Sequence, residues 1–140
     1  MDGAIPSELF GAIAKTKNMK WIETMPGEAW MKVLWTGAES GTWAVLYKWK
    51  KGFTIPPHKH IGGAHLFILS GKIKVRDTIF EAGDYGYEPH GALHESTTTL
   101  EDCEYLFICN GATVALDAAD SDKVIGYFGS EQLLALAGGA

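Results

Sequence analysis

Short hydrophobic runs separated by turn-forming residues repeat along most of the chain, from Trp30 onward. Each run is rich in Val, Ile, Trp, Tyr and Phe, and Gly, Pro or Asp stands between one run and the next. Many short runs at regular spacing are typical of an all-β sandwich or barrel. The predicted strands are Met31–Trp35, Thr42–Trp49, Ala64–Ser70, Lys72–Arg76, Thr78–Glu81, Tyr85–Glu88, His94–Thr99, Glu104–Cys109, Thr113–Asp117 and Val124–Phe128. Turns are predicted at Ser70-Gly71, Ala82-Gly83-Asp84 and Asn110-Gly111.

The run from Thr42 to Lys50 indicates which face of a strand turns inward. Alternate residues of a strand lie on opposite faces, so lysines 48 and 50 share one face with small and aliphatic residues. The aromatic face is therefore predicted to turn inward; its residues are Trp43, Val45, Tyr47 and Trp49. Further aromatic residues that we expect to face inward are Trp35, Phe53, Phe67, Tyr85 and Phe107.

The two ends of the chain differ from its middle. Residues 1–29 are predicted to form an arm with one short helix, and residues 30–128 the barrel. In the tail, 129–140, Ser130 and Glu131 are signals for the start of a helix and Gly138 for its end. Leu133, Leu134 and Leu136 would form its apolar side. At 140 residues the whole chain, 1–140, fits a single domain.

Composition indicates in which cellular compartment the protein is expected. Apolar residues make up 46% and charged residues 21%, which is ordinary for a globular protein. No run approaches the roughly 18–20 apolar residues of a membrane span, and the N-terminus lacks the pattern of a secretory signal. Cys103 and Cys109 are the only cysteines, so no disulfide framework is expected. A cytoplasmic location is the resulting expectation.

The charge distribution argues against nucleic acid as a partner. The formal net charge is −5, and Arg76 is the only arginine. Nucleic-acid binding requires clustered Lys and Arg to displace counterions from phosphates. The one basic cluster, at positions 48, 50 and 51, is typical of the solvated face of a strand. We therefore expect a small-molecule ligand or substrate, with no nucleic acid and no membrane as partner.

All five histidines fall between positions 58 and 94. His58 and His60 lie two residues apart in an extended segment, so their side chains should project to the same side while Lys59 turns away. Two such imidazoles can reach one metal ion at about 2.0–2.2 Å each. The alternative is a pair of surface histidines beside a proline turn.

A second group of residues, from Gly83 to His94, forms a motif that adds a third histidine to the pair. Here the chain resembles the cupin superfamily. Gly52, His58, His60 and Gly71 match its first motif, and Gly83, Pro89, Gly91 and His94 match its second. The resemblance covers about residues 30–128. It implies a jelly-roll barrel, also described as a double-stranded β-helix, in which His58, His60 and His94 hold one divalent metal ion.

The chain departs from the superfamily pattern at the usual glutamate, which is His65 here. It therefore resembles the three-histidine branch of small cupins, which includes acetylacetone-cleaving and dihydroxyacetophenone dioxygenases. It is also similar to the zinc cupin domain of certain anti-sigma factors. This resemblance implies Fe(II) as the favoured metal, with Zn(II), Mn(II) or Ni(II) as alternatives.

The roles of other polar residues stay open. His65 is interpreted as a fourth ligand, as a group that hydrogen-bonds substrate or water near the metal, or as a packed core histidine. His90 is expected to be a plain turn residue. Glu88 and Glu95 flank the second motif as candidate bases, although a solvated strand end explains both equally well. The two cysteines are interpreted as small buried hydrophobes.

Two functions follow from the resemblance. The first is a non-haem Fe(II) dioxygenase that cleaves a C–C bond of a β-diketone or hydroxyketone. The second is a non-catalytic zinc cupin that senses or binds a small ligand; a metal-free sugar epimerase-like cupin is disfavoured by the intact ligand set. A homodimer is expected, paired through sheet edges and terminal segments, with Trp21, Trp30 and the Leu-rich tail as candidate interface residues.

Overall fold

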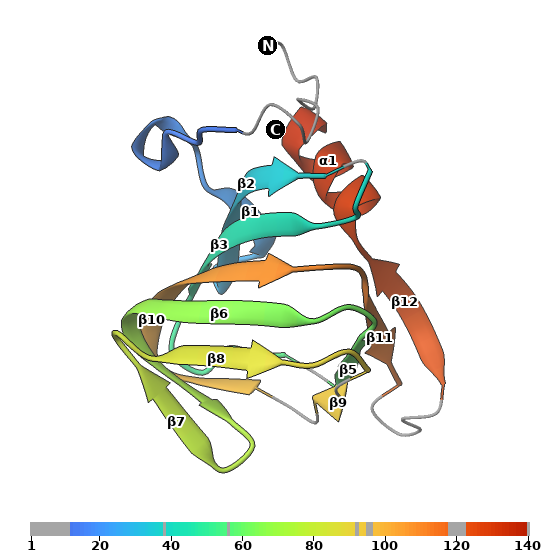
Figure 1. The fold of residues 1–140 in the computed structure, drawn as a ribbon. Helices are drawn as coiled ribbons and strands as arrows, with labels where there is room; N and C mark the ends of the chain where they lie inside the picture. The colour runs from blue at the N-terminus through green and yellow to red at the C-terminus, as the bar shows by residue number, and fades with distance from the viewer. Residues whose placement is uncertain are drawn as a thin grey trace.

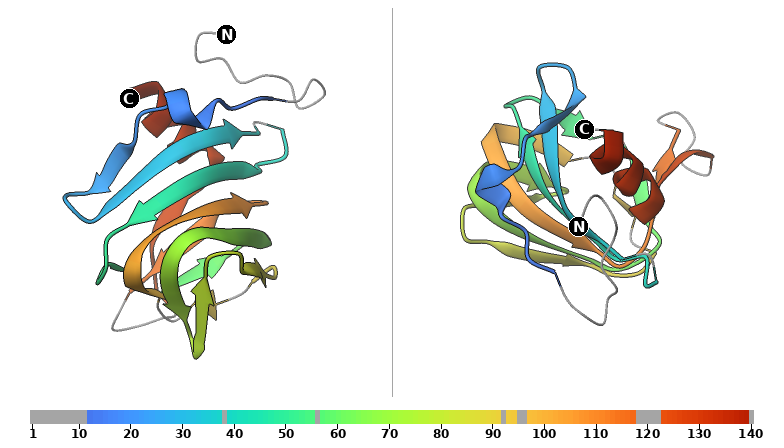
Figure 2. Two further views of the ribbon diagram at one scale, coloured as in Figure 1. Left: turned by 90° about the vertical axis from the view of Figure 1, so that its left-hand side faces the viewer. Right: turned by 90° about the horizontal axis from the view of Figure 1, so that it is seen from above.

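The computed structural model describes residues 12–37, 39–55, 57–91, 93–94, 97–117 and 123–139, with the backbone alone at 93–94 and 138–139. Two antiparallel sheets face each other and close into a barrel (Figures 1 and 2). The fold is mostly β, with one short helix at the C-terminal end, and so confirms the predicted all-β class. None of the described helices is long and apolar enough to cross a membrane.

The larger sheet supplies one wall of the barrel. Its strands run in the order β1 (Ile22–Met25), β2 (Ala29–Thr36), β3 (Trp43–Trp49), β10 (Thr97–Cys109), β6 (Ala64–Val75) and β7 (Thr78–Glu81). Two short strands extend it: β4 (Thr54–Ile55) pairs with β10, and β8 (Tyr85–Glu88) pairs with β6.

The smaller sheet supplies the opposite wall. Its strands run in the order β12 (Val124–Phe128), β11 (Thr113–Leu116), β5 (His58–His60) and β9 (Leu93–His94). The remaining elements are the 3-10 turn η1 (Thr16–Asn18) and the helix α1 (Ser130–Gly139).

The core lies between the two sheets and is rich in aromatic side chains. In β3, Trp43, Val45 and Trp49 are buried, as the alternation of the sequence predicts. Trp43 packs on Phe107 at 5.3 Å between ring centroids, in a tilted arrangement that suits the charge distribution of aromatic rings. The prediction that Phe67 and Tyr85 face inward is wrong: both lie on the outer face, 40% and 59% exposed.

Two strands are longer than the sequence predicts. β6 runs through Gly71 without a turn, and β10 joins two predicted strands into one. The pairing between β6 and β10 shifts register beside Gly71, whose φ is +80°. A side chain here would overlap the carbonyl oxygen of Asp102. Gly71 therefore marks a bulge within a long, bent strand.

Both ends of the described chain pack on the barrel. The Nζ of Lys32 donates a hydrogen bond to the carbonyl oxygen of Thr16 at 2.7 Å and lies 4.6 Å from the ring centroid of Trp21. Strand β1 was not predicted, because its sequence alternates weakly and it pairs only at the sheet edge. Helix α1 follows the predicted tail, and its Leu133 is fully buried in the core. Trp21 and Leu133 thus make contacts within the chain.

Candidate metal centre and cavity

His58 and His60 stand on strand β5 and turn to the same side of the smaller sheet. Their ring centroids lie 5.1 Å apart, and the rings are inclined by 69°. An imidazole centre sits about 3.2 Å from a metal bound at one of its nitrogens, so two rings at adjacent tetrahedral or octahedral positions around one ion have centres about 4.5–5.2 Å apart. The observed separation falls within this range, and the pair therefore fits a shared metal ion.

His94 is brought to the same place by strand pairing. β9 runs antiparallel to β5, and His94 is the residue directly opposite His58. Residues opposite each other in an antiparallel pair have Cβ atoms about 4.5–5.5 Å apart. The side chain of His94 lies outside the described part of the structure, and the described side chains alone contain no group of three His, Cys, Asp or Glu residues placed for a metal. The backbone pairing of β5 with β9 nevertheless brings the two cupin motifs side by side.

The turn of the second motif is tied to the first. The backbone N–H of Gly91 donates a hydrogen bond of 2.7 Å to the carbonyl oxygen of His60. Gly91 has a φ of +76°, a conformation that suits glycine. His90, in the same turn, is exposed, which agrees with a plain turn residue.

His60 is held in the form that a metal requires. It is 1% exposed. Burial, with further contributions from the positive charges of His58 and Arg76, lowers the pKa of His60 from 6.5 to about 4. A neutral imidazole has a free nitrogen lone pair, whereas a protonated one has none. At neutral pH His60 is therefore a competent ligand.

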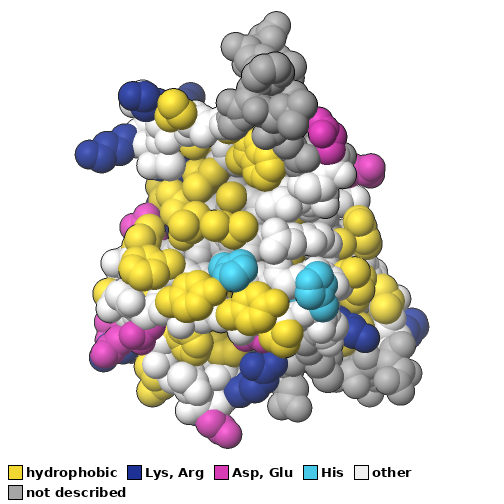
Figure 3. Space-filling model, in the orientation of Figure 1, with side chains coloured by type: hydrophobic (Ala, Val, Ile, Leu, Met, Phe, Trp, Pro, Cys, Tyr) yellow, Lys and Arg dark blue, Asp and Glu magenta, His cyan; other side chains and the backbone are white. Residues whose placement is uncertain are grey.

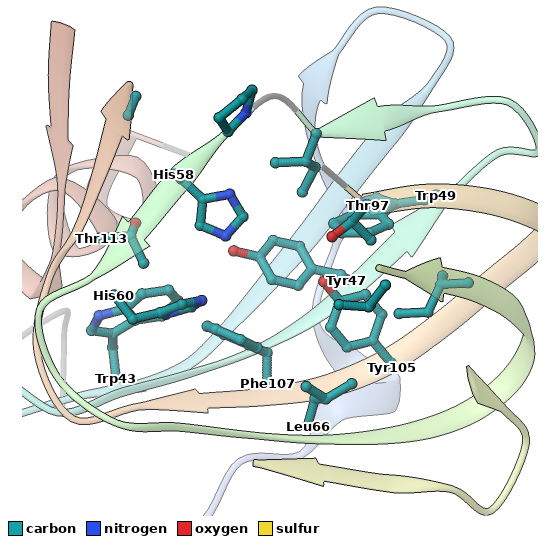
Figure 4. Close-up of a pocket in the computed structure, with 15 residues that line it drawn as sticks. Trp43, Tyr47, Trp49, His58, His60, Leu66, Thr97, Tyr105, Phe107 and Thr113 are labelled. Atoms are coloured by element: carbon teal, nitrogen blue, oxygen red, sulfur yellow. The ribbon is translucent and has the colours of Figure 1, made fainter. Parts of the chain in front are cut away.

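A cavity of about 210 Å³ opens beside these histidines, between the two sheets (Figure 4). His58 and His60 form one end, and aromatic rings from the larger sheet form much of the wall. No Asp, Glu, Lys or Arg is among the described residues that line it. They are Trp43, Tyr47, Trp49, Ile55, Pro57, His58, His60, Leu66, Ile73, Val75, Thr97, Tyr105, Phe107, Thr113 and Ala115. Such a cavity suits a small organic ligand with a few oxygen atoms.

Two phenols stand in the cavity wall. Burial raises the pKa of Tyr47 well above its usual range, and it does the same for Tyr105. Both hydroxyls are therefore protonated at neutral pH and can donate a hydrogen bond. In Figure 4 the hydroxyl of Tyr47 points toward His58.

His65 lies on the opposite side of the larger sheet, which corrects the prediction that it ligates the metal or stands beside it. Strand β6 alternates, so the buried Ala64 and Leu66 face inward while His65 faces outward. Its Nδ1 is 2.5 Å from the hydroxyl oxygen of Tyr85, and its ring packs on Tyr87. Figure 3 shows histidine side chains beside hydrophobic ones on the face of the molecule drawn there. His65 is not a packed core histidine either, because it is only half-buried.

Glu88 is buried but does not line the cavity. Its Oε1 lies 3.6 Å from the Nη1 of Arg76, and its side chain is 9% exposed. Because Arg76 lies at this carboxylate, Glu88 is placed as a partner of the arginine and away from the cavity wall. Glu95 falls outside the described residues.

The two cysteines are small buried residues in β10, as expected. Burial raises the pKa of the Cys103 thiol to about 12 and that of the Cys109 thiol to about 11.

The sequence analysis did not identify the positions of Tyr47 in the cavity wall and of Arg76 beside Glu88. Tyr47 was identified only as an inward-facing aromatic residue of its strand, although the alternation that placed it there also pointed it at the cavity. Arg76 follows β6 in the left-handed region, with φ of +54°. Its proximity to Glu88 depends on the pairing of β8 with β6, which no local pattern reveals.

Comparison with known proteins identifies the family and the fold to which this chain is similar. The model of the ChrR cupin-like domain family matches residues 11–114. The acetylacetone-cleaving enzyme of Acinetobacter johnsonii is 28% identical over 109 residues, which cover 74% of this chain and 69% of the relative. A crystal structure of an acetylacetone dioxygenase from that bacterium has a TM-score of 0.77 at 20% identity, over 91% of this chain and 89% of that chain.

A further similarity is to the complex of SigE with the anti-sigma factor ChrR from Rhodobacter sphaeroides. It has a TM-score of 0.57 at 25% identity, over 68% of this chain and 51% of that chain. The structural neighbours confirm the cupin fold. The match over residues 11–114, about three quarters of its length, shows that the chain belongs to the family of ChrR cupin-like domains.

Proposed function

We propose that this cupin holds one divalent metal ion with His58, His60 and His94, and that with Fe(II) it acts as a dioxygenase cleaving a C–C bond of a β-diketone or hydroxyketone. The observation that carries the proposal is the convergence of the two histidine motifs at one end of an aromatic-lined cavity, whose described lining has no Asp, Glu, Lys or Arg. The acetylacetone-cleaving enzyme among the relatives supports this choice of reaction.

The residues of the chain favour an anionic, oxygen-bearing ligand. Three neutral imidazoles add no negative charge to the site, and no carboxylate lines the described cavity wall. A bound Fe(II) ion would supply Lewis acidity and the redox chemistry that O₂ requires. An enolate, formed when a β-diketone loses a proton, would be attracted to this site, and the apolar wall would exclude competing water.

A non-catalytic zinc cupin is the second candidate, and the ChrR family match favours it. A structural zinc site is closed by four protein ligands, whereas a catalytic site keeps an open position. The residue predicted to be a fourth ligand, His65, faces the other side of the sheet. Among the described residues lining the cavity, His58 and His60 are the only ones of a type that commonly ligates zinc. An open site is therefore the better supported of the two.

Metal analysis and oxygen uptake test the proposal. The protein is purified without chelator, its metal content is measured, and samples reloaded with Fe(II) or with Zn(II) are given a panel of β-dicarbonyls and hydroxyketones. We expect one metal per chain, and consumption of O₂ equal to the loss of ketone with Fe(II) alone. Stoichiometric metal without any O₂ uptake would favour the zinc-binding alternative. Absence of bound metal would contradict the metal centre itself.

A further inference from the structure

Tyr47 occupies a defined position between the histidines and the aromatic end of the cavity. It lies in β3, opposite Met31 on one side and Tyr105 on the other. Its ring packs on Tyr105 at 5.2 Å, on Trp49 at 5.3 Å and on Phe107 at 5.8 Å between centroids. These contacts fix the ring, and so they fix the hydroxyl that points toward His58 (Figure 4).

The hydroxyl of Tyr47 is available for a ligand. Buried tyrosine hydroxyls usually have a hydrogen-bond partner. Among the described residues, the contacts recorded for Tyr47 are those of its ring. Thr113, at the histidine end of the cavity, differs, because its hydroxyl donates to the carbonyl oxygen of Phe128 at 3.5 Å. The cavity thus presents a phenolic donor aimed at the space beside the histidines.

We propose that Tyr47 determines specificity by donating a hydrogen bond to an oxygen atom of the ligand, and that the ligands so selected are enolisable β-dicarbonyl compounds. This inference rests on the proposed metal site, which would bind the same group of the ligand. An enolate spreads one negative charge over two oxygens, and each oxygen has more than one lone pair. Hydrogen bonds to a charged acceptor are about twice as strong as those between neutral groups. Tyr47 therefore favours the enolate over the neutral ketone.

The test uses zinc-loaded protein, because zinc has no redox chemistry and leaves the probe intact. Acetylacetone is titrated into the parent protein and into Tyr47→Phe, which removes the hydroxyl and keeps the ring. We expect about tenfold to hundredfold weaker binding of acetylacetone by Tyr47→Phe, the effect of one hydrogen bond to a charged group. Its zinc content should be unchanged. The near-ultraviolet absorption of the bound enolate should also shift, because the hydrogen bond perturbs its electrons.

Tyr87→Phe is the matched control. It deletes the same atom from a tyrosine on the outer face of the larger sheet, which is 49% exposed and does not line the cavity, and we expect its affinity for acetylacetone to stay within about threefold of the parent. A parent-like affinity in Tyr47→Phe, or an equal loss in Tyr87→Phe, would overturn the inference.

A measurement without any variant guards against misfolding of Tyr47→Phe. In proton NMR of the parent, acetylacetone should bring out a downfield phenolic resonance with nuclear Overhauser contacts to the Tyr47 ring, and its absence would overturn the inference. The two proposals fail in different ways. A parent protein that takes up no zinc contradicts the proposed function and this inference with it. Zinc uptake without effects at Tyr47 contradicts the inference alone.

Discussion

The two-residue spacing of His58 and His60 determines their common direction, because side chains two positions apart in a strand share a face. The structure adds two facts that the spacing does not give, the position of His94 and the burial of His60. Register places His94 opposite His58, and burial keeps His60 neutral. The three residues come from two chain segments that meet in the smaller sheet, where β5 pairs with β9.

Replacement of His94 by alanine should remove most of the bound metal. The imidazole is one of three expected ligands, and loss of a ligand weakens binding strongly while the barrel core is untouched. The matched control is His65→Ala, which removes an imidazole from the outer face of β6. Metal per chain and circular dichroism are measured on both variants. The site assignment is wrong if His94→Ala keeps one metal per chain, or if His65→Ala loses it.

For His65 and Tyr47, the sequence alone did not predict the position of the side chain relative to the site. A motif alignment places His65 near the metal, but the face of β6 is decided by which of its alternate residues pack in the core. Phe67 shares the face of His65, and its hydrophobicity suggested an inward direction. Tyr47 was correctly placed inside by alternation. The role proposed for Tyr47 depends on its position relative to His58 in the folded chain (Figure 4), so no local pattern could assign it.

Cys103 and Cys109 should resist alkylation in the folded protein. The thiolate is the reactive form, and raised pKa values of about 12 and about 11 leave very little of it at pH 8. Iodoacetamide treatment followed by mass spectrometry should show little modification in buffer and two modified cysteines in concentrated urea. Rapid labelling of the folded protein would show that β10 opens readily or that the thiols are not buried as described.

At the scale of the element, the long strands β6 and β10 explain the shape of the larger sheet. The sequence predicts a turn at Ser70-Gly71 because serine and glycine are common in turns. The structure uses the same glycine for a bulge, since its backbone lies against Asp102 and Cys103 of the neighbouring strand. A turn and a bulge require the same positive φ at glycine. Only pairing with β10, remote in sequence, distinguishes them.

Gly71→Ala should destabilise the fold much more than Gly83→Ala does. Both glycines have positive φ, +80° and +92°, so both substitutions incur the strain of a left-handed residue, about 1–2 kcal/mol. A Cβ at position 83 meets nothing within 4 Å, whereas one at position 71 would lie 2.7 Å from the Cα of Cys103. Urea unfolding should show an additional loss of about 2 kcal/mol or more for Gly71→Ala. Equal losses would mean that the two strands separate there at little cost.

Short strands are the elements that the sequence predicts least well. β4 and β9 have two residues each and β5 has three, too few for alternation to be visible. They form because longer neighbours supply their hydrogen-bond partners, as β11 does for β5. The candidate ligands stand on two of these short strands. Their choice as candidate ligands therefore came from the cupin motifs, whereas strand alternation indicated only that His58 and His60 share a side.

At the scale of the whole molecule, the barrel class was predictable because its evidence is spread over many strands. Errors in single strand ends do not change it. The relation between copies of the chain is different, and the homodimer stays a prediction. Trp21 packs on Lys32 and Lys48 of its own sheet, and Leu133 belongs to the core. Two of the residues expected at an interface thus already have partners within the chain.

Binding of zinc should stabilise the whole fold at pH 7.5 and lose this effect by about pH 5. A ligand at 100 times its dissociation constant adds about 2.7 kcal/mol, which raises the midpoint of thermal unfolding by several degrees. Ligand imidazoles must be neutral, so protons compete with the metal as the pH falls below the value of about 6.5 for free histidine.

The metal-free protein should itself lose stability at low pH, because the pKa of His60 is lowered to about 4 in the folded chain. The unfolded chain therefore takes up the proton first, and stability present above about pH 6.5 is lost as the pH falls toward 4. Thermal unfolding with and without zinc at pH 7.5, 6 and 5 measures both effects, with His94→Ala as the control that should show no zinc shift at any pH. An equal zinc shift at pH 7.5 and pH 5 would exclude a centre built from histidines, because protonated imidazoles do not bind metal.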